Sequence, residues 1–393
     1  MHKIRIIQRC MFLFFLSVLF VCIGCSLNPS RTAQWETLEV TGQPTARHEA
    51  AFVAYASKLY LMGGRRINPT DEFDIASTTW KNLSAPPLEI HHFQPVVVDD
   101  AIYILGAMTG GWPNEKPLDK VLIYYPDRDE YKFSHTIPEH RRRGGAGVAY
   151  FNGKIYIVGG ITNGHMNGYK PWLDEYDPET GEWKILDDAP NARDHFQAVV
   201  VNNKLYAFAG RTTSKATNQD MALTTAYGNI YDFLSSQWLP VSDELTLPTL
   251  RAGNAAFVSG AEVVVVGGES DTQLAAFSEV EAFNTLTHTW SLWPSLNRGR
   301  HGSGTAIVDG YVYIASGSGN HGGGPELTDI ERLKLPLSSS SLSSSPLILQ
   351  PGISQPRTSQ SMRSKSLSQS DNLPVLQQWH TLTLDFEGLE TSE

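Results

Sequence analysis

Arginine and histidine side chains recur at one kind of position, directly before a short apolar run. They are Arg47, His48, His91, His92, Arg142, Arg143, Arg193, His195, Arg251, Arg300 and His301. A guanidinium binds a carboxylate through two parallel hydrogen bonds, and an imidazole exchanges protons near neutral pH. If these side chains converge, they predict a site for an anion or an acidic sugar. The alternative is that the arginines bond carbonyls and carboxylates of neighbouring sheets and stabilise the fold.

Carboxylates and aromatic residues near these positions extend the chemistry. Five carboxylates are near these positions: Glu49, Asp194, Glu269, Asp271 and Glu326. A carboxylate that is desolvated beside a histidine acts as a general acid or base. The alternative is that these carboxylates are solvated charges on loops. Trp112 and Trp172, with Tyr169, either stack on sugar rings or pack the loops that carry them. None of these residues is assigned a catalytic role.

No metal ion or other cofactor is expected. The histidines fall in different segments, which would hold most of them further apart than one ion reaches, at about 2 Å per ligand. The glycine-rich residues 319–325 precede no helix, so they predict no phosphate site.

The sheets that position these side chains are predicted most clearly by residues 143–183. Two apolar runs are joined by Asn152-Gly153, which suits a tight hairpin, and two further strands are joined by a turn at 178–181. A glycine doublet ends the second strand, where a Cβ would obstruct neighbouring backbone. The pattern predicts one four-stranded antiparallel sheet, whose apolar faces need further copies to cover them.

The copies are present. The doublets are Gly63-Gly64, Gly106-Ala107, Gly159-Gly160, Ala209-Gly210, Gly267-Gly268 and Ser316-Gly317, at steps of 43, 53, 50, 58 and 49 residues. An aromatic residue follows each of the first five: Trp80, Tyr131, Trp183, Trp238 and Trp290. This repeat resembles the kelch repeat, which forms one blade of a β-propeller.

The resemblance implies an all-β, six-bladed kelch-type β-propeller over residues 34–336. The sixth copy lacks its aromatic residue, so we expect the last blade to be closed by the N-terminal strand around Trp35. Kelch propellers include binding modules and unrelated enzymes, so the resemblance implies a fold and no single activity. Galactose oxidase, one such enzyme, is excluded as an analogue because its copper site needs a cysteine in the propeller, and Cys10, Cys22 and Cys25 all precede it.

Loop lengths predict the binding face. The turns between strands one and two and between three and four are short, whereas the loops between strands two and three are long, for example residues 106–120 and 159–175. These long loops share a face with the arginine and histidine positions. Recognition often resides in long loops on a rigid scaffold, so we expect the ligand there.

Residues 1–25 combine a basic start with an apolar run and predict export. Ile23-Gly24-Cys25 resembles a bacterial lipoprotein box, which implies lipidation of Cys25, a tether at 26–33 and anchorage in the cell envelope. An ordinary cleaved signal peptide, giving a secreted protein, and an uncleaved anchor are the alternatives.

The net charge of −10 without a basic tract argues against nucleic acid as a partner. Residues 337–372 are rich in serine and proline and predict a linker. Residues 373–393 are either an acidic tail or, through a pattern from Trp379 to Gly388, resemble the first strand of a β-sandwich that precedes glycoside hydrolase domains.

We therefore expect an exported, monomeric binding module for a carbohydrate or a protein. The alternatives are a sugar-active enzyme similar to the sialic acid mutarotases and an accessory domain of a polysaccharide hydrolase. A deep polar pocket with a paired arginine and carboxylate would favour the enzyme. A shallow mouth filled by salt bridges between blades would favour the binding module.

Overall fold

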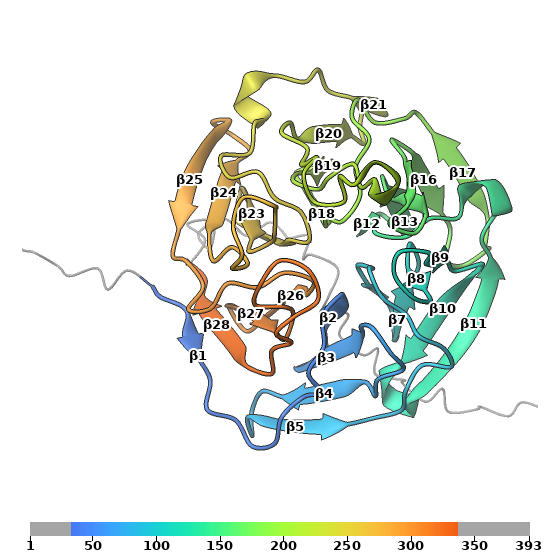
Figure 1. Cartoon of the computed structure of the whole chain (residues 1–393). Coiled ribbons are helices and arrows are strands. Elements are labelled where there is room, and N and C mark those ends of the chain that lie inside the picture. The colour runs from blue at the N-terminus through green and yellow to red at the C-terminus, as the bar shows by residue number, and fades with distance from the viewer. Residues whose placement is uncertain (1–32, 337–393) are drawn as a thin grey trace, which may run out of the picture. The chain divides into compact units, whose positions relative to one another are not determined.

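Six four-stranded antiparallel sheets form a ring in the computed structural model, which describes residues 33–336 (Figure 1). The first strand of each sheet lies nearest the central axis, and later strands lie further out (Figure 1). The predicted six-bladed propeller is confirmed. The predictions for the leader, most of the tether, the linker and the C-terminal tail lie outside the described residues.

The blades are built as follows. Blade 1 contains β2 (Ala50–Tyr55), β3 (Lys58–Gly63), β4 (Asp71–Asp74) and β5 (Thr79–Asn82), and blade 2 contains β6 (Val96–Val98), β7 (Ala101–Ile104), β10 (Lys120–Tyr125) and β11 (Glu130–Thr136). Blade 3 contains β12 (Gly147–Phe151), β13 (Lys154–Val158), β16 (Leu173–Tyr176) and β17 (Trp183–Leu186), and blade 4 contains β18 (Ala198–Val201), β19 (Lys204–Ala207), β20 (Asn229–Asp232) and β21 (Gln237–Trp238). Blade 5 contains β22 (Ala255–Ser259), β23 (Glu262–Val266), β24 (Val280–Asn284) and β25 (Thr289–Trp293), and blade 6 contains β26 (Thr305–Val308), β27 (Tyr311–Ala315), β28 (Ile330–Lys334) and β1 (Glu36–Thr37).

Two of the long loops contain hairpins of their own. The loop of blade 2 forms β8 (Met108–Thr109) and β9 (Lys116–Pro117), and that of blade 3 forms β14 (Ile161–Asn163) and β15 (Asn167–Tyr169). In the described part of the chain, helix is confined to short 3-10 turns at Pro126–Arg128, Glu139–Arg141, Lys215–Thr217 and Asp243–Leu245. Within residues 33–336, no helix has the length and apolar character needed to cross a membrane.

The glycine doublets are required by the approach of the next blade. A Cβ on Gly63 would lie 2.4 Å from the carbonyl oxygen of Ile90, and one on Gly267 would lie 2.3 Å from that of Arg300. Both glycines also have positive φ, which a larger side chain would make costly. The obstruction expected from the sequence is therefore confirmed at these positions.

The apolar core is divided among the interfaces between blades. In one interface, Phe52 and Phe73 of blade 1 pack with Tyr313 and Ile330 of blade 6. The last blade is completed by β1, whose residues Glu36 and Thr37 pair with β28 as its outermost strand. The predicted closure by the N-terminal strand is confirmed.

Candidate functional site at the mouth of the central channel

Six residues just before the innermost strands form a closed ring around the central axis, called here the axial ring. They are Glu49, His92, Gly145, His195, Gly253 and Gly302, and each has a φ between 53° and 63°. At five of the six blade junctions, the amide of one ring residue donates to the carbonyl of its counterpart in the preceding blade, as from Gly145 to His92 at 2.9 Å. At the sixth, the Ala50 amide donates to the Gly302 carbonyl at 3.0 Å. Direct bonds between backbones make the ring narrow.

Three ring positions carry side chains where glycine is the unstrained residue. A non-glycine residue in the left-handed region costs on the order of 1 to 3 kcal/mol, and such strain tends to gather at functional sites. The fold accepts this cost at Glu49, His92 and His195, whereas blades 3, 5 and 6 have glycine. The narrow ring brings the three side chains together at the mouth of the channel, where they line one small cavity of about 40 Å³.

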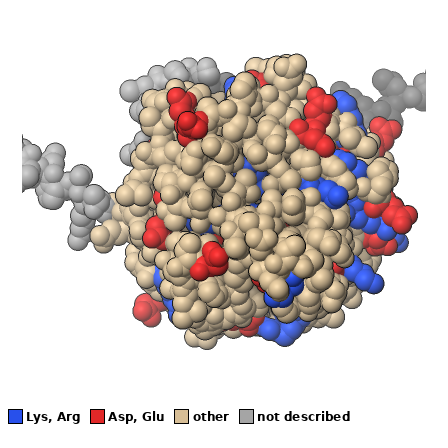
Figure 2. Space-filling view, turned by 45° about the horizontal axis from the view of Figure 1, so that its top comes forward, with Lys and Arg blue, Asp and Glu red and all other residues tan. Residues whose placement is uncertain are grey.

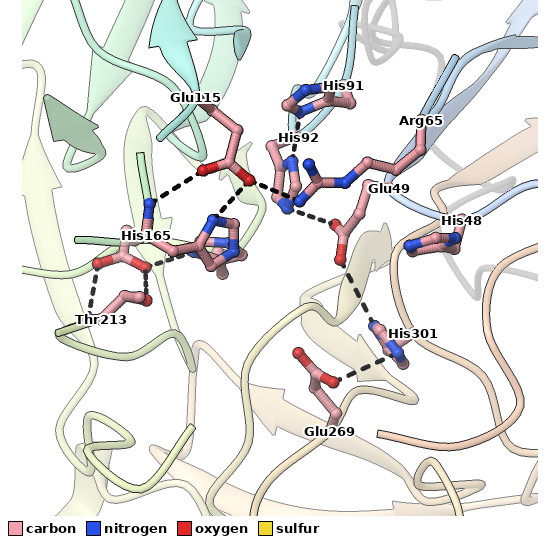
Figure 3. Close-up of polar contacts among 12 residues, drawn as sticks. His48, Glu49, Arg65, His91, His92, Glu115, His165, Thr213, Glu269 and His301 are labelled. Carbon is pink, nitrogen blue, oxygen red and sulfur yellow. Dashed lines mark hydrogen bonds and ion pairs between the residues drawn. The ribbon is translucent and has the colours of Figure 1, made fainter. Parts of the chain in front are cut away.

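His92 and His195 meet a third histidine, His165, from the loop between β14 and β15 (Figure 3). Their ring centroids lie 4.7 to 5.0 Å apart, and Nε2 of His195 lies 3.0 Å from Nε2 of His165. These three buried residues are called the histidine cluster. The argument that blade spacing would keep the histidines apart is wrong for His92 and His195, because the ring is too narrow.

Each histidine of the cluster has a polar neighbour on its far side. The carboxylate of Asp194 hydrogen-bonds Nδ1 of His195, and Oε1 of Glu115 lies 2.9 Å from Nδ1 of His165. Nδ1 of His92 lies 2.6 Å from Nδ1 of His91, whose Nε2 donates to the Gly110 carbonyl at 3.0 Å. These contacts fix the orientation of the rings.

A second polar group lies beside the histidine cluster and contains Glu49, Glu269 and His301 (Figure 3). Nε2 of His301 donates to the Gly322 carbonyl at 2.8 Å and lies 3.3 Å from Glu269. Glu49 lies between the two groups, with Oε2 3.2 Å from Nε2 of His92 and Oε1 3.9 Å from Nδ1 of His301. The mouth is thus one continuous polar network.

Ion pairs between blades close this network. Arg65 of blade 1 pairs with Glu115 of blade 2, and Arg211 of blade 4 pairs with Glu269 of blade 5, both at 2.6 Å. At the rim, Glu326 of blade 6 accepts from Arg66 of blade 1 at 2.7 Å and lies 2.8 Å from Nδ1 of His48. The mouth is therefore filled by salt bridges between blades.

Burial controls the ionisation of the mouth. It lowers the pKa of His92 well below the usual range for histidine and also lowers the pKa of His195. It lowers the pKa of His91 to about 4, with Arg65 adding to the effect. Burial opposes the ionisation of Glu115, but the contacts with His165 and Arg65 outweigh it and lower the pKa of that carboxyl to about 2. The neutral imidazole of His92 therefore faces the ionised carboxylate of Glu49, whose pKa, despite its burial, is lowered well below its usual range by His92.

The arginines predicted as ligand groups lie inside the blades. Five are at most 4% exposed, and each donates to carbonyls of its own blade and to an acid or amide on the third strand: Arg47 to Asp71, Arg143 to Asp174, Arg193 to Asn229, Arg251 to Glu281 and Arg300 to Glu331. The expectation that these acceptors belong to neighbouring sheets is wrong. Their burial and their bonds within the blade favour the structural role over contact with a ligand, although Nε of Arg193, Arg251 and Arg300 has no hydrogen-bond partner.

The predicted aromatic residues differ in exposure. Trp112 is 53% exposed in the loop between β8 and β9, and Nζ of Lys215 lies 5.2 Å from its ring centroid. Tyr169 is 40% exposed at the end of β15. Trp172 lies against the guanidinium of Arg141 at 4.1 Å, so its ring already has a partner.

Sequence reasoning missed four residues of the mouth, namely Arg65, Glu115, His165 and Arg211. All four follow a glycine doublet, in the long loops assigned to the binding face. Arg65 and Arg211 directly follow their doublets, at the position that Glu269 occupies in blade 5, whereas Glu115 and His165 occupy no repeated position. For Glu115 and His165, membership of a long loop was the only signal, and it did not distinguish them from other polar loop residues. For Arg65 and Arg211, the repeated position after the doublet was a second signal.

The fold and the mouth define a class, the six-bladed kelch-type β-propellers with a polar network at one end of the channel. A family model described as the Attractin/LZTR1 beta-propeller matches residues 28–276, and the chain belongs to this family.

Named relatives are similar over much of the propeller. The chain is 26% identical over 326 residues to the Kelch-like protein terF of Aspergillus terreus, covering 76% of this chain and 69% of terF. It is 25% identical over 336 residues to the N-(sulfonatooxy)prop-2-enimidothioate sulfolyase of Thlaspi arvense, covering 72% of this chain and 91% of that protein. It is 26% identical over 189 residues to Kelch-like protein 40 of Xenopus laevis, of which it covers only 29%. A solved structure described as "Structure of YjhT" shares the fold, with a TM-score of 0.62 and 16% identity over 74% of this chain and 96% of that one.

Proposed function

We propose that this kelch-like interaction module binds a partner protein or a carbohydrate on the face that carries the long loops. The observation that carries the proposal is Trp112, which is 53% exposed on a loop whose base is fixed. Glu115, three residues further on, pairs with Arg65, and the Pro113 carbonyl accepts from the His165 amide at 2.9 Å. An exposed aromatic side chain on a rigid loop is a frequent anchor in binding sites.

The loops around Trp112 form a connected surface. The His165 carbonyl accepts from the Lys215 amide at 2.8 Å, which ties the loop of blade 3 to that of blade 4. Other apolar residues stand exposed in loops of the same type, namely Ile67, Tyr169 and Leu274. Basic and acidic residues are interspersed among uncharged ones in the view of Figure 2, without a wide basic field of the kind that nucleic acid needs.

Replacing Trp112 by alanine tests the binding face. We expect affinity for a glycan or protein ligand to fall about tenfold or more, because an anchoring tryptophan often contributes over 1 kcal/mol, while the melting temperature stays unchanged. The measurement is an array of neutral and acidic oligosaccharides, followed by titration of each hit and of any protein partner found by cross-linking. Leu292→Ala is the control, because Leu292 is 79% exposed on the outer strand β25. Equal binding by wild type and Trp112→Ala would refute the proposal.

An enzyme at the mouth is the second candidate, and the buried histidines beside carboxylates favour it. A similar protein, the Thlaspi arvense relative, has the name of a lyase. The mouth cavity of about 40 Å³ has room for about one water molecule, whereas a sugar needs far more. The closed mouth therefore favours the binding module. A test for the mutarotase-like alternative is the rate at which sialic acid anomers equilibrate, followed by proton NMR with and without the protein.

Export and lipid anchorage are also part of the proposal. They are supported by the signal-like sequence of residues 1–25 and by Cys25, which lie outside the described residues. Replacing Cys25 by serine is expected to abolish lipid attachment, since only a thiol accepts the lipid, whereas Cys10→Ser should have no effect. Metabolic labelling with a fatty acid and membrane fractionation in a bacterial host measure both variants. Undiminished labelling of Cys25→Ser would show that the anchor is elsewhere or absent.

A further inference from the structure

The histidine cluster contains two ring nitrogens without a hydrogen bond, Nε2 of His92 and Nδ1 of His165. His92, His165 and His195 are at most 6% exposed, and one ring nitrogen from each lies within 4.8 Å of the others. Nε2 of His92 makes no hydrogen bond, although a buried polar atom left unpaired is costly. The unpaired nitrogen of His92 therefore indicates a ligand independently of the closeness of the three rings.

The tautomer of His92 follows from its neighbours. Because a carbonyl only accepts hydrogen bonds, Nε2 of His91 carries the proton that it donates to Gly110. Nδ1 of His91 is then an acceptor, so Nδ1 of His92 carries the proton between them. Nε2 of His92 is left with a bare lone pair, and the group next to it is the carboxylate of Glu49 at 3.2 Å. A lone pair facing a carboxylate is repulsive unless a positive charge lies between them.

The same reasoning applies to the other two histidines. Asp194 accepts from Nδ1 of His195, so the proton belongs on that Nδ1. Nδ1 of His165 makes no hydrogen bond, but it lies 2.9 Å from Oε1 of Glu115, and a carboxylate at this distance favours a proton on Nδ1 over a lone pair. Both Nε2 atoms then have lone pairs, yet they lie 3.0 Å apart. Two facing lone pairs require a proton or a cation. A carboxylate behind a histidine whose other nitrogen is free is the usual outer support of a metal-binding histidine.

The formal charges of the side chains at the mouth also favour a bound cation. Four carboxylates, of Glu49, Glu115, Asp194 and Glu269, face the two guanidinium groups of Arg65 and Arg211. The carboxylates outnumber the guanidinium groups by two, and one divalent cation would balance this difference.

We infer that His92, His165 and His195 bind one divalent first-row transition-metal ion, with the Glu49 carboxylate next to the remaining coordination position. Imidazole ligands suit zinc, iron, copper and nickel. Nitrogens on one zinc ion lie about 2.0 to 2.1 Å from it and about 3.4 Å from one another, so small side-chain shifts complete the site. The expectation of no metal rested on blade spacing, which does not hold at this ring. The inference does not depend on the proposed binding of a protein or carbohydrate, because the site lies beneath that surface.

The test uses the full chain, purified without chelator and analysed for metal by mass spectrometry. After removal of metal with EDTA, it is titrated with Zn²⁺ by calorimetry and with Co²⁺ by visible absorption. We expect one ion per chain and a Co²⁺ band typical of nitrogen ligands. His92→Gly and His195→Gly should each weaken binding by roughly 100-fold or more, and Asp194→Asn by about 10- to 100-fold. Glycine suits both positions, because it occupies the axial ring in three other blades.

Two further variants separate loss of the site from loss of the fold. His165→Asn, in a loop outside the axial ring, should also abolish binding without changing the circular dichroism spectrum. His288→Gln, at an exposed position in blade 5, should leave binding intact. The inference is overturned if the full chain neither contains nor takes up Zn²⁺ or Co²⁺. In that case a proton shared between Nε2 of His165 and Nε2 of His195 accounts for their close approach. It is also overturned if the three histidine variants bind both ions as tightly as the wild type.

Discussion

Replacing Trp35 by alanine is expected to lower the free energy of unfolding by about 3 to 5 kcal/mol and the melting temperature by roughly 10 °C. Trp35 is 4% exposed and packs with Val264, Leu296 and Leu333 at the interface of blades 5 and 6. Its Nε1 donates to the Pro294 carbonyl at 2.9 Å. The substitution therefore leaves a large cavity and an unpaired carbonyl where the N-terminal strand closes the ring.

Deleting residues 31–40 should have a larger effect, because it also exposes the edge of β28 and so favours aggregation. Differential scanning calorimetry and light scattering on the full chain measure both changes. Trp112→Ala is the matched control, since it removes the same side chain from an exposed loop and should change stability by less than about 1 kcal/mol. If Trp35→Ala melts with the wild type, the ring does not depend on this closure.

The fold could be predicted because each blade repeats the same local requirements. A carbonyl of the next segment lies too close for a Cβ at Gly63, Gly159 and Gly267, and Asn152-Gly153 forms the expected hairpin with positive φ at both residues. Six repeats of one pattern also made the missing aromatic residue of the last blade conspicuous. Trp35 could therefore be assigned to a strand some 300 residues away in the chain.

The mouth could be predicted only in part. His91, His92, His195 and His301 converge as expected, because they occupy repeated positions whose place in the ring follows from the repeat. His165 comes from an irregular loop, and no periodic pattern places it at the mouth. Partners contributed by such loops depend on the path of each loop, which a single sequence leaves undetermined.

The distance between histidines was misjudged for a physical reason. Spacing between whole blades suggests a wide mouth, but the axial-ring residues bond backbone to backbone, as from the Gly253 amide to the His195 carbonyl at 2.6 Å. Positive φ at His92 and His195 accompanies this close approach. Two side chains from blades that are not adjacent can therefore contact each other.

The sequence left two interpretations of the arginines, as ligand-binding groups or as structural groups, and their solvent exposure distinguishes between the two. A ligand-binding arginine must be reached from solvent, whereas Arg47 and Arg251 are 0% exposed. Nη1 of Arg251 donates to Oε2 of Glu281 at 2.6 Å and to the Thr249 carbonyl at 3.0 Å, and Nη2 donates to the Val265 carbonyl at 3.3 Å. This one side chain joins the second and third strands of blade 5 to the segment that precedes its first strand.

Replacing Arg251 by alanine is therefore expected to cost about 3 to 5 kcal/mol, because Glu281 becomes a buried carboxylate without its partner. Chemical denaturation of the full chain measures the loss. Arg332→Ala is the control: its ion pair with Glu36 is partly exposed, with side chains 27% and 59% accessible, and should contribute about 0 to 1 kcal/mol.

The double variant Arg251→Met with Glu281→Leu distinguishes loss of the pair from loss of volume. Removing both charges leaves no unpaired carboxylate, so the double variant should be more stable than Arg251→Ala alone. Metal uptake at the mouth should persist in both, since Arg251 contacts none of the histidine cluster. If Arg251→Ala kept its stability but lost ligand binding, the guanidinium would belong to the binding site after all.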